Sequence, residues 1–174
     1  GYAEPFYKDI IFDTLDWLDY DIFKKQIRVT TITNGMYFNE KMYKRWVDRV
    51  NSSCIMFSID AGSRETYKKI RIADAYDLVS KNLIRYGKNR DKKYHDINVN
   101  CNINILNVKE YVKMVELVAE ADVTAFQIGP TDSMPITEDI CVNESNREIF
   151  KENFELARVR AEELGVNIQL LKGF

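Results

Sequence analysis

The sequence has few of the residues that define several specialised protein classes. Its 174 residues include 7 glycines, 3 prolines and 3 cysteines, which excludes collagen-like chains and disulfide scaffolds. No uninterrupted apolar run approaches the ~20 residues that a membrane-spanning helix needs. The 25 basic and 27 acidic residues give a formal charge of −2, so the chain has no overall field that attracts nucleic acid. We therefore expect neither a nucleic-acid partner nor a membrane partner.

Cysteine and histidine are too sparse for the commonest metal and nucleophile sites. Cys54, Cys101 and Cys141 are too far apart to form a Cys-x-x-Cys pair, and we interpret them as small buried residues of a reducing cytosol. We therefore predict a cytoplasmic protein without metal ligands in this chain. The only histidine, His95, ends a charged segment at 88–95, where we expect a solvated loop. A catalytic triad is excluded, and the catalytic residues stay unidentified.

The composition that remains is typical of one globular domain. The sequence is 45% hydrophobic and 30% charged, and its length matches a single hydrophobic core, so we assign residues 1–174 to one domain. It begins at Gly1 rather than at methionine. That beginning favours a fragment or a processed chain.

Short β-branched runs alternate with longer amphipathic runs along the whole sequence. Strands are expected at 27–33, 54–59, 97–106, 123–128 and 166–171. Helices are expected at 6–26, 39–50, 63–71 and 76–88. Two more are expected to begin at capping boxes, one at 107–110 and one at 145–148 that continues to 164. Alternation of this kind predicts parallel strands joined by right-handed crossovers. A barrel, a partial barrel and an open doubly wound sheet all fit this pattern.

The segment at 97–106 favours a barrel among these α/β folds. Its apolar residues fall on one face, and Asn98, Asn100, Asn102 and Asn104 fall on the other. A buried parallel strand is apolar on both faces, whereas a barrel strand that lines a wet lumen has one polar face. The alternative interpretation is a half-exposed antiparallel or edge strand, which alternates in the same way.

Polar residues or glycines follow most of the expected strands, where a parallel sheet binds its ligands. The segments are Glu4, 33–35, 58–60, 104–107 and 127–130. Each has a simpler explanation when taken alone, since Asn-Gly commonly forms a turn and an aspartate commonly caps a helix. Their placement at one rim of the sheet predicts a small-molecule site of undefined chemistry.

Read in order, these rim segments resemble the radical S-adenosylmethionine enzymes, in particular the branch that modifies peptides. Residues 1–5 resemble the Gly-Glu-Pro segment that binds the amino group of S-adenosylmethionine. Residues 33–35 are similar to the turn after the family's third strand, and 58–71 to its fourth strand and following helix. Residues 98–110 resemble the fifth strand with its Asn-x-x-Glu helix start, and 126–128 the sixth strand beside the adenine.

The resemblance implies a partial (β/α)6 barrel with parallel strands, truncated at the N-terminus before the end of the second strand. It implies S-adenosylmethionine as the cofactor and a peptide or another small molecule as the substrate. The cofactor-binding residues that it implies are Ala3, Glu4, Asn34, Ser58, Asp60, Arg71, Asn104 and Gln127. The parent enzyme would cleave S-adenosylmethionine reductively and use the deoxyadenosyl radical to take hydrogen from the substrate.

The sequence departs from the family at two points. Ala3 stands where a glycine is usual, which restricts the backbone there. The Cys-x-x-x-Cys-x-x-Cys loop, which ligates the family's [4Fe–4S] cluster, does not occur in the 174 residues. We interpret the chain as a fragment, inactive alone, of an oxidoreductase-type enzyme whose cluster loop lies upstream.

Two alternatives remain open at this stage. One is an α/β barrel without a cluster that binds a small molecule directly. The other is a non-catalytic interaction module, in which the sheet edge left exposed by a missing strand mediates self-association.

Overall fold

A computed structural model describes residues 4–130 and 143–170, and in them strands and helices alternate. The strands are β1 (Val29–Thr33), β2 (Ser53–Ser58), β3 (His95–Ile103), β4 (Ala125–Pro130) and β5 (Ile168–Leu170). The α-helices are α1 (Ile10–Trp17), α2 (Tyr20–Phe23), α3 (Glu40–Arg49), α4 (Arg64–Arg71), α5 (Tyr76–Asn89), α6 (Tyr111–Glu120) and α7 (Arg147–Leu164). Two short 3-10 helices are η1 (Tyr7–Asp9) and η2 (Val108–Glu110). The alternation predicted from the sequence is confirmed.

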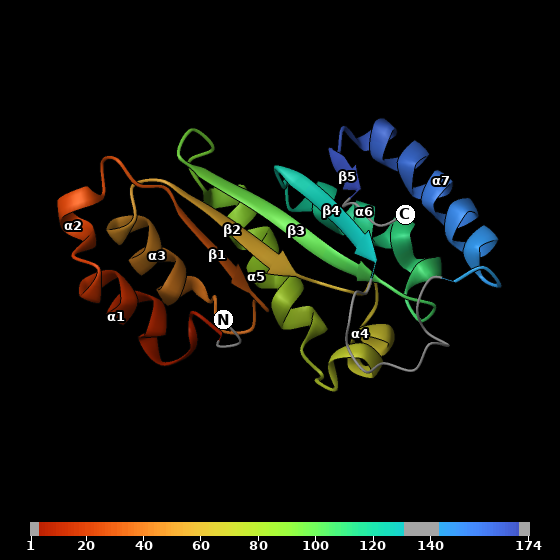
Figure 1. Cartoon of the computed structure of the whole chain (residues 1–174), viewed down its shortest axis with the longest axis horizontal. Helices are drawn as coiled ribbons and strands as arrows, with labels where there is room; N and C mark the ends of the chain where they lie inside the picture. The colour runs from red at the N-terminus through yellow and green to blue at the C-terminus, as the bar shows by residue number, and fades with distance from the viewer. Residues whose placement is uncertain (1–3, 131–142, 171–174) are drawn as a thin grey trace.

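The five strands form one parallel sheet in the order β1-β2-β3-β4-β5. Figure 1 shows α3, α5 and α6 on the far side of this sheet, with the other face turned toward the viewer. A doubly wound sheet reverses its strand order at a switch point, and this sheet does not. Sequential order with one-sided helices is the arrangement of a barrel wall, so the predicted partial α/β barrel is confirmed.

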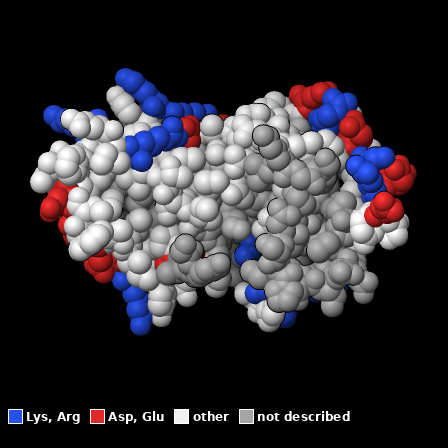
Figure 2. All heavy atoms as spheres, in the orientation of Figure 1, with Lys and Arg blue, Asp and Glu red and all other residues white. Residues whose placement is uncertain are grey.

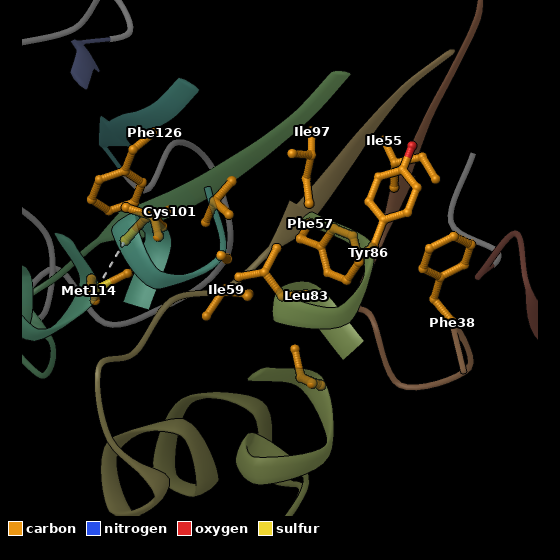
Figure 3. Packing of buried hydrophobic residues seen from close by; sticks show 14 of the residues in the cluster. Phe38, Ile55, Phe57, Ile59, Leu83, Tyr86, Ile97, Cys101, Met114 and Phe126 are labelled. Atoms are coloured by element: carbon orange, nitrogen blue, oxygen red, sulfur yellow. Dashed lines mark hydrogen bonds between the residues drawn. The ribbon is translucent and has the colours of Figure 1, made fainter. Parts of the chain in front are cut away.

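The core lies between the sheet and these helices. Ile97, Val99, Cys101 and Ile103 of β3 are at most 2% exposed, as their alternation predicted. Figure 3 shows the side chains of Ile97 and Cys101 among residues that β2, β4 and the helices contribute. The rings of Phe38 and Tyr86 meet edge to face with their centroids 5.2 Å apart. Burial of this apolar surface is the main stabilising contribution to such a fold.

The sequence prediction of one helix at 6–26 is wrong. The segment is divided into η1, α1 and α2, and Asp9 and Asp19 have φ values of 63° and 49° at the breaks. Short polar side chains tolerate this left-handed conformation better than other side chains do. The predicted apolar stripe is interrupted accordingly, because Leu15 is buried whereas Ile22 is 72% exposed.

Neither predicted capping box forms. Asn107 makes no side-chain cap at η2, and α7 begins one residue later than predicted, after Asn146, also without a side-chain cap. At α7 the Ser145 hydroxyl donates instead to Asn143 Oδ1 over 2.7 Å. Asn107 and Glu110 instead bond to the connection between β2 and α4.

The segment at 88–95 is exposed at 88–89 and 91–94, as predicted for a solvated loop, but its first two residues belong to α5, and Arg90 and His95 are buried. The Arg90 guanidinium donates to the carbonyl oxygens of Gly87, His95 and Asp122, which ties the turn to α5 and to the segment after α6. His95 is only 6% exposed, so its prediction as a surface residue is wrong. Its position at the start of β3 is nevertheless at the opposite end of the sheet from the predicted rim, as expected.

Candidate functional site

At the end of β1, Glu4 closes the turn that follows the strand. Its Oε1 accepts from the Thr33 hydroxyl over 2.6 Å, and its Oε2 accepts from the Asn34 backbone N–H over 2.8 Å. The turn needs glycine at 35, where φ is +78° and an added Cβ would lie 2.8 Å from the Phe57 ring. The Asn34 side chain is used locally, since its Oδ1 accepts from the Met36 N–H over 2.9 Å.

At the end of β2, Arg71 brings Ser58 and Asp60 together. Its Nη2 donates to Ser58 Oγ over 2.6 Å and lies 2.5 Å from Asp60 Oδ2. Arg71 is the last residue of α4, so this helix carries the guanidinium back to the strand from which the chain came. The other Asp60 oxygen, Oδ1, accepts from the Asn102 N–H of β3 over 2.8 Å.

The environment of this ion pair is unusual for a charged group. Asp60 is 4% exposed, and this burial raises the pKa of its carboxyl group, although Arg71 and the Asn102 N–H oppose the shift. Arg71 Nε is buried and has no hydrogen-bond partner among the described residues. Buried N–H groups in native folds nearly always have a hydrogen-bond acceptor, so this Nε–H is a candidate donor to a ligand.

The two polar groups at the ends of β1 and β2 lie close together. In the sheet register Thr33 pairs with Phe57, so the residues that follow these two are neighbours. The Tyr67 hydroxyl of α4 is close enough to Glu4, Asp60 and Arg71 to interact with their charges. Burial raises the pKa of the Tyr67 hydroxyl, with Asp60 and Glu4 adding to the shift and Arg71 opposing it. Of the predicted residues, Glu4, Asn34, Ser58, Asp60 and Arg71 are therefore brought to one rim.

The remaining predicted residues have different environments. Asn104 is 7% exposed, and its Oδ1 accepts from the Leu106 N–H over 2.9 Å, so its side chain stabilises its own turn. Gln127 lies on the open face of β4 and donates through Nε2 to Gln169 Oε1 over 3.1 Å. Ala3 lies outside the described residues. Whether any of the eight binds a cofactor stays a prediction.

Two residues that are not among the eight predicted cofactor-binding residues hold the rim in place. Asn107 donates through Nδ2 to the carbonyl oxygens of Asp60 and Asn102, over 2.9 and 2.8 Å. Glu110 accepts from the Gly62 N–H over 2.9 Å and from the hydroxyls of Ser63 and Thr66 at the start of α4. The Asn-x-x-Glu spacing was visible in the sequence and predicted a local helix cap. The partners of Glu110 instead lie 44 to 48 residues away along the chain, where a local pattern cannot indicate them.

Next to this rim, the open face of the sheet carries a row of neutral polar side chains. Ser58, Asn100, Gln127 and Gln169 stand in register across β2, β3, β4 and β5. The Oδ1 atoms of Asn98 and Asn100 are buried and have no hydrogen-bond partner among the described residues. The polar face predicted from the alternation of β3 is confirmed, and two of its amide oxygens make no hydrogen bond with the described residues.

No metal centre is built by the part of the chain that is described. No group of three or more histidine, cysteine, aspartate or glutamate side chains that could hold a metal ion occurs there. Cys101 is buried against Met114, with the two sulfur atoms 3.9 Å apart, and Cys54 is half-buried. Cys101 is buried as predicted, whereas Cys54 is only half-buried. Cys141 lies outside the described residues. Among residues 4–130 and 143–170, no helix is long and apolar enough to cross a membrane.

The residues at the rim fit S-adenosylmethionine in chemical terms. The ligand carries an ammonium, a carboxylate, two ribose hydroxyls and an adenine. The Glu4 carboxylate suits the ammonium. Arg71 Nε, which has no partner among the described residues, lies beside the Ser58 hydroxyl and suits an anionic or hydroxyl oxygen. The amide oxygens of Asn98 and Asn100, which also make no hydrogen bond within 4–130 and 143–170, suit N–H and O–H donors. The three cysteines at 54, 101 and 141 do not fit a [4Fe–4S] site of the family's spacing.

No protein-family model matches the sequence, and no curated protein matches it. Solved structures do match the fold. SuiB from Streptococcus suis, bound to S-adenosylmethionine, aligns with a TM-score of 0.66 at 12% identity over 97% of this chain and 35% of SuiB. SuiB bound to its precursor peptide SuiA gives a TM-score of 0.70 at 13% identity over 97% of this chain and 36% of SuiB.

Two further structures have the same architecture. TYW1 with a lysine-pyruvate adduct aligns with a TM-score of 0.59 at 16% identity, over 88% of this chain and 47% of TYW1. A radical S-adenosylmethionine methyltransferase from Sphaerobacter thermophilus aligns with a TM-score of 0.57 at 12% identity, over 83% of this chain and 40% of the enzyme. The chain thus spans between 35% and 47% of the length of these proteins. Over that span, it has the fold of the radical S-adenosylmethionine enzymes.

Proposed function

We propose that the rim at the carboxyl ends of β1, β2 and β3 binds S-adenosylmethionine, as part of a radical S-adenosylmethionine enzyme. The observation that carries the proposal is the Arg71 guanidinium. It is fixed by Ser58 and Asp60, yet its Nε is buried and unpaired among the described residues. A side chain held by two partners with a third donor unused is preorganised for a ligand.

Each residue at the rim has a separate task in this proposal. Glu4 accepts from the ammonium of the cofactor and holds the turn after β1 at the same time. Ser58 and Arg71 bind the cofactor's carboxylate and ribose, and Asp60 orients Arg71. Gln127 would lie beside the adenine, and Asn34 and Asn104 hold the turns of the rim. Ala3 belongs to the segment that would bind the cofactor's ammonium. When the cofactor is bound and reduced, the family's chemistry supplies a deoxyadenosyl radical.

The [4Fe–4S] cluster would be ligated outside these 174 residues, since the family's cysteine loop does not occur in them. An oxidoreductase-type reaction and a cytoplasmic location are part of the same proposal. The domain assignment of residues 1–174 and self-association at a sheet edge stay predictions.

The open face of the sheet is the proposed place for the substrate. Its residues next to the rim are amides without charge, and two of them have buried acceptor atoms without partners among the described residues. Such a surface suits a neutral group with N–H donors, and a peptide presents these along its whole backbone. One neighbouring structure, SuiB, is bound to a precursor peptide. We therefore favour a peptide over other small molecules as the substrate.

The test is the affinity for S-adenosylmethionine of the whole protein from which this chain comes. Arg71→Lys keeps a positive charge beside Asp60 but removes Nε and the planar guanidinium. Arg28→Lys is the matched control at the other end of the sheet, where Arg28 is paired with Asp96. Calorimetric titration is expected to give a dissociation constant raised at least tenfold by Arg71→Lys, corresponding to the ~1.5–3 kcal/mol of a hydrogen bond to a charged group. The control is expected to change it less than twofold.

The thermal unfolding midpoint of both variants is measured in parallel, so that a loss of fold is distinguished from a loss of binding. Equal affinity in the wild type and in folded Arg71→Lys would contradict the proposal. Absence of S-adenosylmethionine binding in the whole protein would leave the direct small-molecule barrel or the interaction module as the better interpretation.

A further inference from the structure

A second hollow lies at the amino ends of the strands, at the opposite end of the sheet from the rim. It has a volume of about 600 Å³. It is formed by three connections, namely the segment between α2 and β1, the turn between α3 and β2, and the residues that lead into β3. This volume lies within the ~300–1,000 Å³ that small-molecule pockets occupy.

The charge of this amino-end pocket is all of one sign. The charged residues that line it are Lys24, Lys25 and Arg28, and none of its lining residues is acidic. Figure 2 shows basic side chains gathered at the upper left, where the amino ends of β1, β2 and β3 lie in Figure 1. Lys24 contacts Asp21 over 3.3 Å, but Lys25 has no acidic partner within residues 4–130 and 143–170.

Arg28 is positioned by contacts that leave part of its guanidinium available. Its Nη2 donates to the Ser53 carbonyl over 3.3 Å and also to Asp96. Asp96 is itself on the open face of the sheet and does not line the pocket. The guanidinium has five N–H donors, and these contacts use one nitrogen. A fixed guanidinium with unused donors is suited to oxyanions.

The floor of the pocket adds a neutral donor. Trp46 Nε1 donates to Ser53 Oγ over 3.1 Å, and Ser53 Oγ lies 2.8 Å from His95 Nδ1. Tryptophan can only donate, so Ser53 Oγ keeps its own proton for a second partner, and His95 Nδ1 can accept it. In that tautomer the proton of the neutral imidazole is on Nε2. Burial lowers the pKa of His95, which favours this neutral form at neutral pH.

We infer that this pocket binds a small molecule through a phosphate or carboxylate group, held by Lys24, Lys25, Arg28 and the His95 Nε2–H. The exposed apolar part of the pocket, which includes Ile27 and Tyr94, would contact the rest of that molecule. The site is separate from the proposed S-adenosylmethionine site, because its residues lie at the amino ends of β1, β2 and β3 whereas the rim residues lie at the carboxyl ends. It depends on neither the proposed cofactor nor the proposed reaction.

The probes for the test are inorganic pyrophosphate and citrate, each titrated calorimetrically into the whole protein at low and at physiological salt. We expect one of them to bind with one site per chain. Lys25→Glu is expected to raise its dissociation constant more than tenfold, because the variant places a carboxylate beside the ligand. Preference for pyrophosphate identifies a phosphate site, and preference for citrate identifies a carboxylate site.

The matched control is Lys81→Glu, which makes the same charge change at an exposed lysine of α5 that has no acidic partner among the described residues. It is expected to change the dissociation constant less than twofold. His95→Gln is expected to weaken binding severalfold without changing its salt dependence, since it removes a neutral donor.

Three results would overturn the inference. They are no binding of either anion, equal weakening by Lys25→Glu and Lys81→Glu, and an unchanged affinity in both Lys25→Glu and His95→Gln. The affinity of each variant for S-adenosylmethionine is measured as well. It is expected to equal that of the wild type, so a failure of this site is distinguishable from a failure of the proposed function.

Discussion

The two ends of the sheet differ in how their charged side chains are placed. At the carboxyl ends, Arg71 and Asp60 are paired with each other, and the pair is held by backbone groups and by Ser58. At the amino ends, Ser53 and His95 make a buried neutral contact, and the buried Arg90 guanidinium donates to backbone carbonyl oxygens. The cations Lys24, Lys25 and Arg28 line an open pocket there. The first arrangement fixes side-chain positions at the cost of desolvation, whereas the second leaves charge available to solvent and ligands.

The largest expected difference between the two ends is in the cost of losing an arginine. Arg71→Ala leaves Asp60 buried without its cation and is expected to lower the free energy of unfolding by about 3 kcal/mol. Arg28→Ala leaves Asp96, whose side chain is 33% exposed, and is expected to cost less than about 1 kcal/mol. Urea unfolding at pH 7.5 measures both values.

The pH dependence of the Arg71→Ala deficit is a further check on the same pair. Burial without the cation raises the pKa of Asp60 above its unfolded value, so the deficit is largest above the folded pKa. It is expected to shrink as the pH falls and Asp60 takes up a proton. A deficit that stays constant between pH 7.5 and pH 4.5 would show that lost packing, and not charge, dominates.

The second prediction concerns how the rim is anchored. Glu110→Ala removes the acceptor for Gly62, Ser63 and Thr66 and is expected to cost about 2 kcal/mol. Glu116→Ala is the control on the same side of the fold, because Glu116 makes an exposed pair with Arg160. It is expected to cost less than about 0.5 kcal/mol. Chemical denaturation tests this difference, and equal costs would contradict the anchoring role of Glu110.

The third prediction compares one serine at each end of the sheet. Ser53→Ala leaves the Trp46 N–H and His95 Nδ1 without their shared partner in a site that is fully buried, and is expected to cost about 1–2 kcal/mol. Ser58→Ala removes one of several Arg71 acceptors at a half-buried position and is expected to cost about 0.5–1 kcal/mol. Thermal unfolding of both variants ranks them, and the reverse order would contradict the description of the amino end as a closed network.

The last prediction concerns the titration of His95. Burial lowers its folded pKa below the ordinary 6.5, with Arg28 contributing in the same direction and Asp91 opposing it. The unfolded chain therefore takes up the proton first as the pH falls, and stability decreases below about pH 6.5, by at most about 1.4 kcal/mol per pH unit for one proton. His95→Gln is expected to flatten this part of the curve of unfolding free energy against pH. An identical slope in the variant would contradict a buried neutral imidazole.

The alternation of strands and helices could be predicted from the sequence because each element type produces its own local spacing of apolar residues. The alternation of β3 also predicted its polar face, since side chains of a strand point to opposite sides. The prediction failed where distant groups decide the structure. Glu110 looked like a local cap, but its partners come from the connection to α4. His95 looked solvated, but Ser53 and Arg90 hold its segment against the sheet.

The candidate site was predictable in part for the same reason. The ends of the strands could be read from the sequence, so Glu4, Ser58 and Asp60 were assigned to one rim, where the structure has them. The use of Asn34 and Asn104 in their own turns depends on side-chain rotamers, which periodicity does not encode. The unpaired Nε of Arg71 depends on how α4 ends against β2, which only the packed fold defines.

Hydrogen–deuterium exchange of the whole protein, with and without S-adenosylmethionine, tests the central claim most directly. The account predicts that the cofactor slows exchange in segments 33–36, 58–63 and 100–104 at the carboxyl ends of the strands. It also predicts no change in segments 24–28, 51–53 and 92–96 at the amino ends. Protection confined to the amino ends, or no protection in either set, would contradict an S-adenosylmethionine site at the rim.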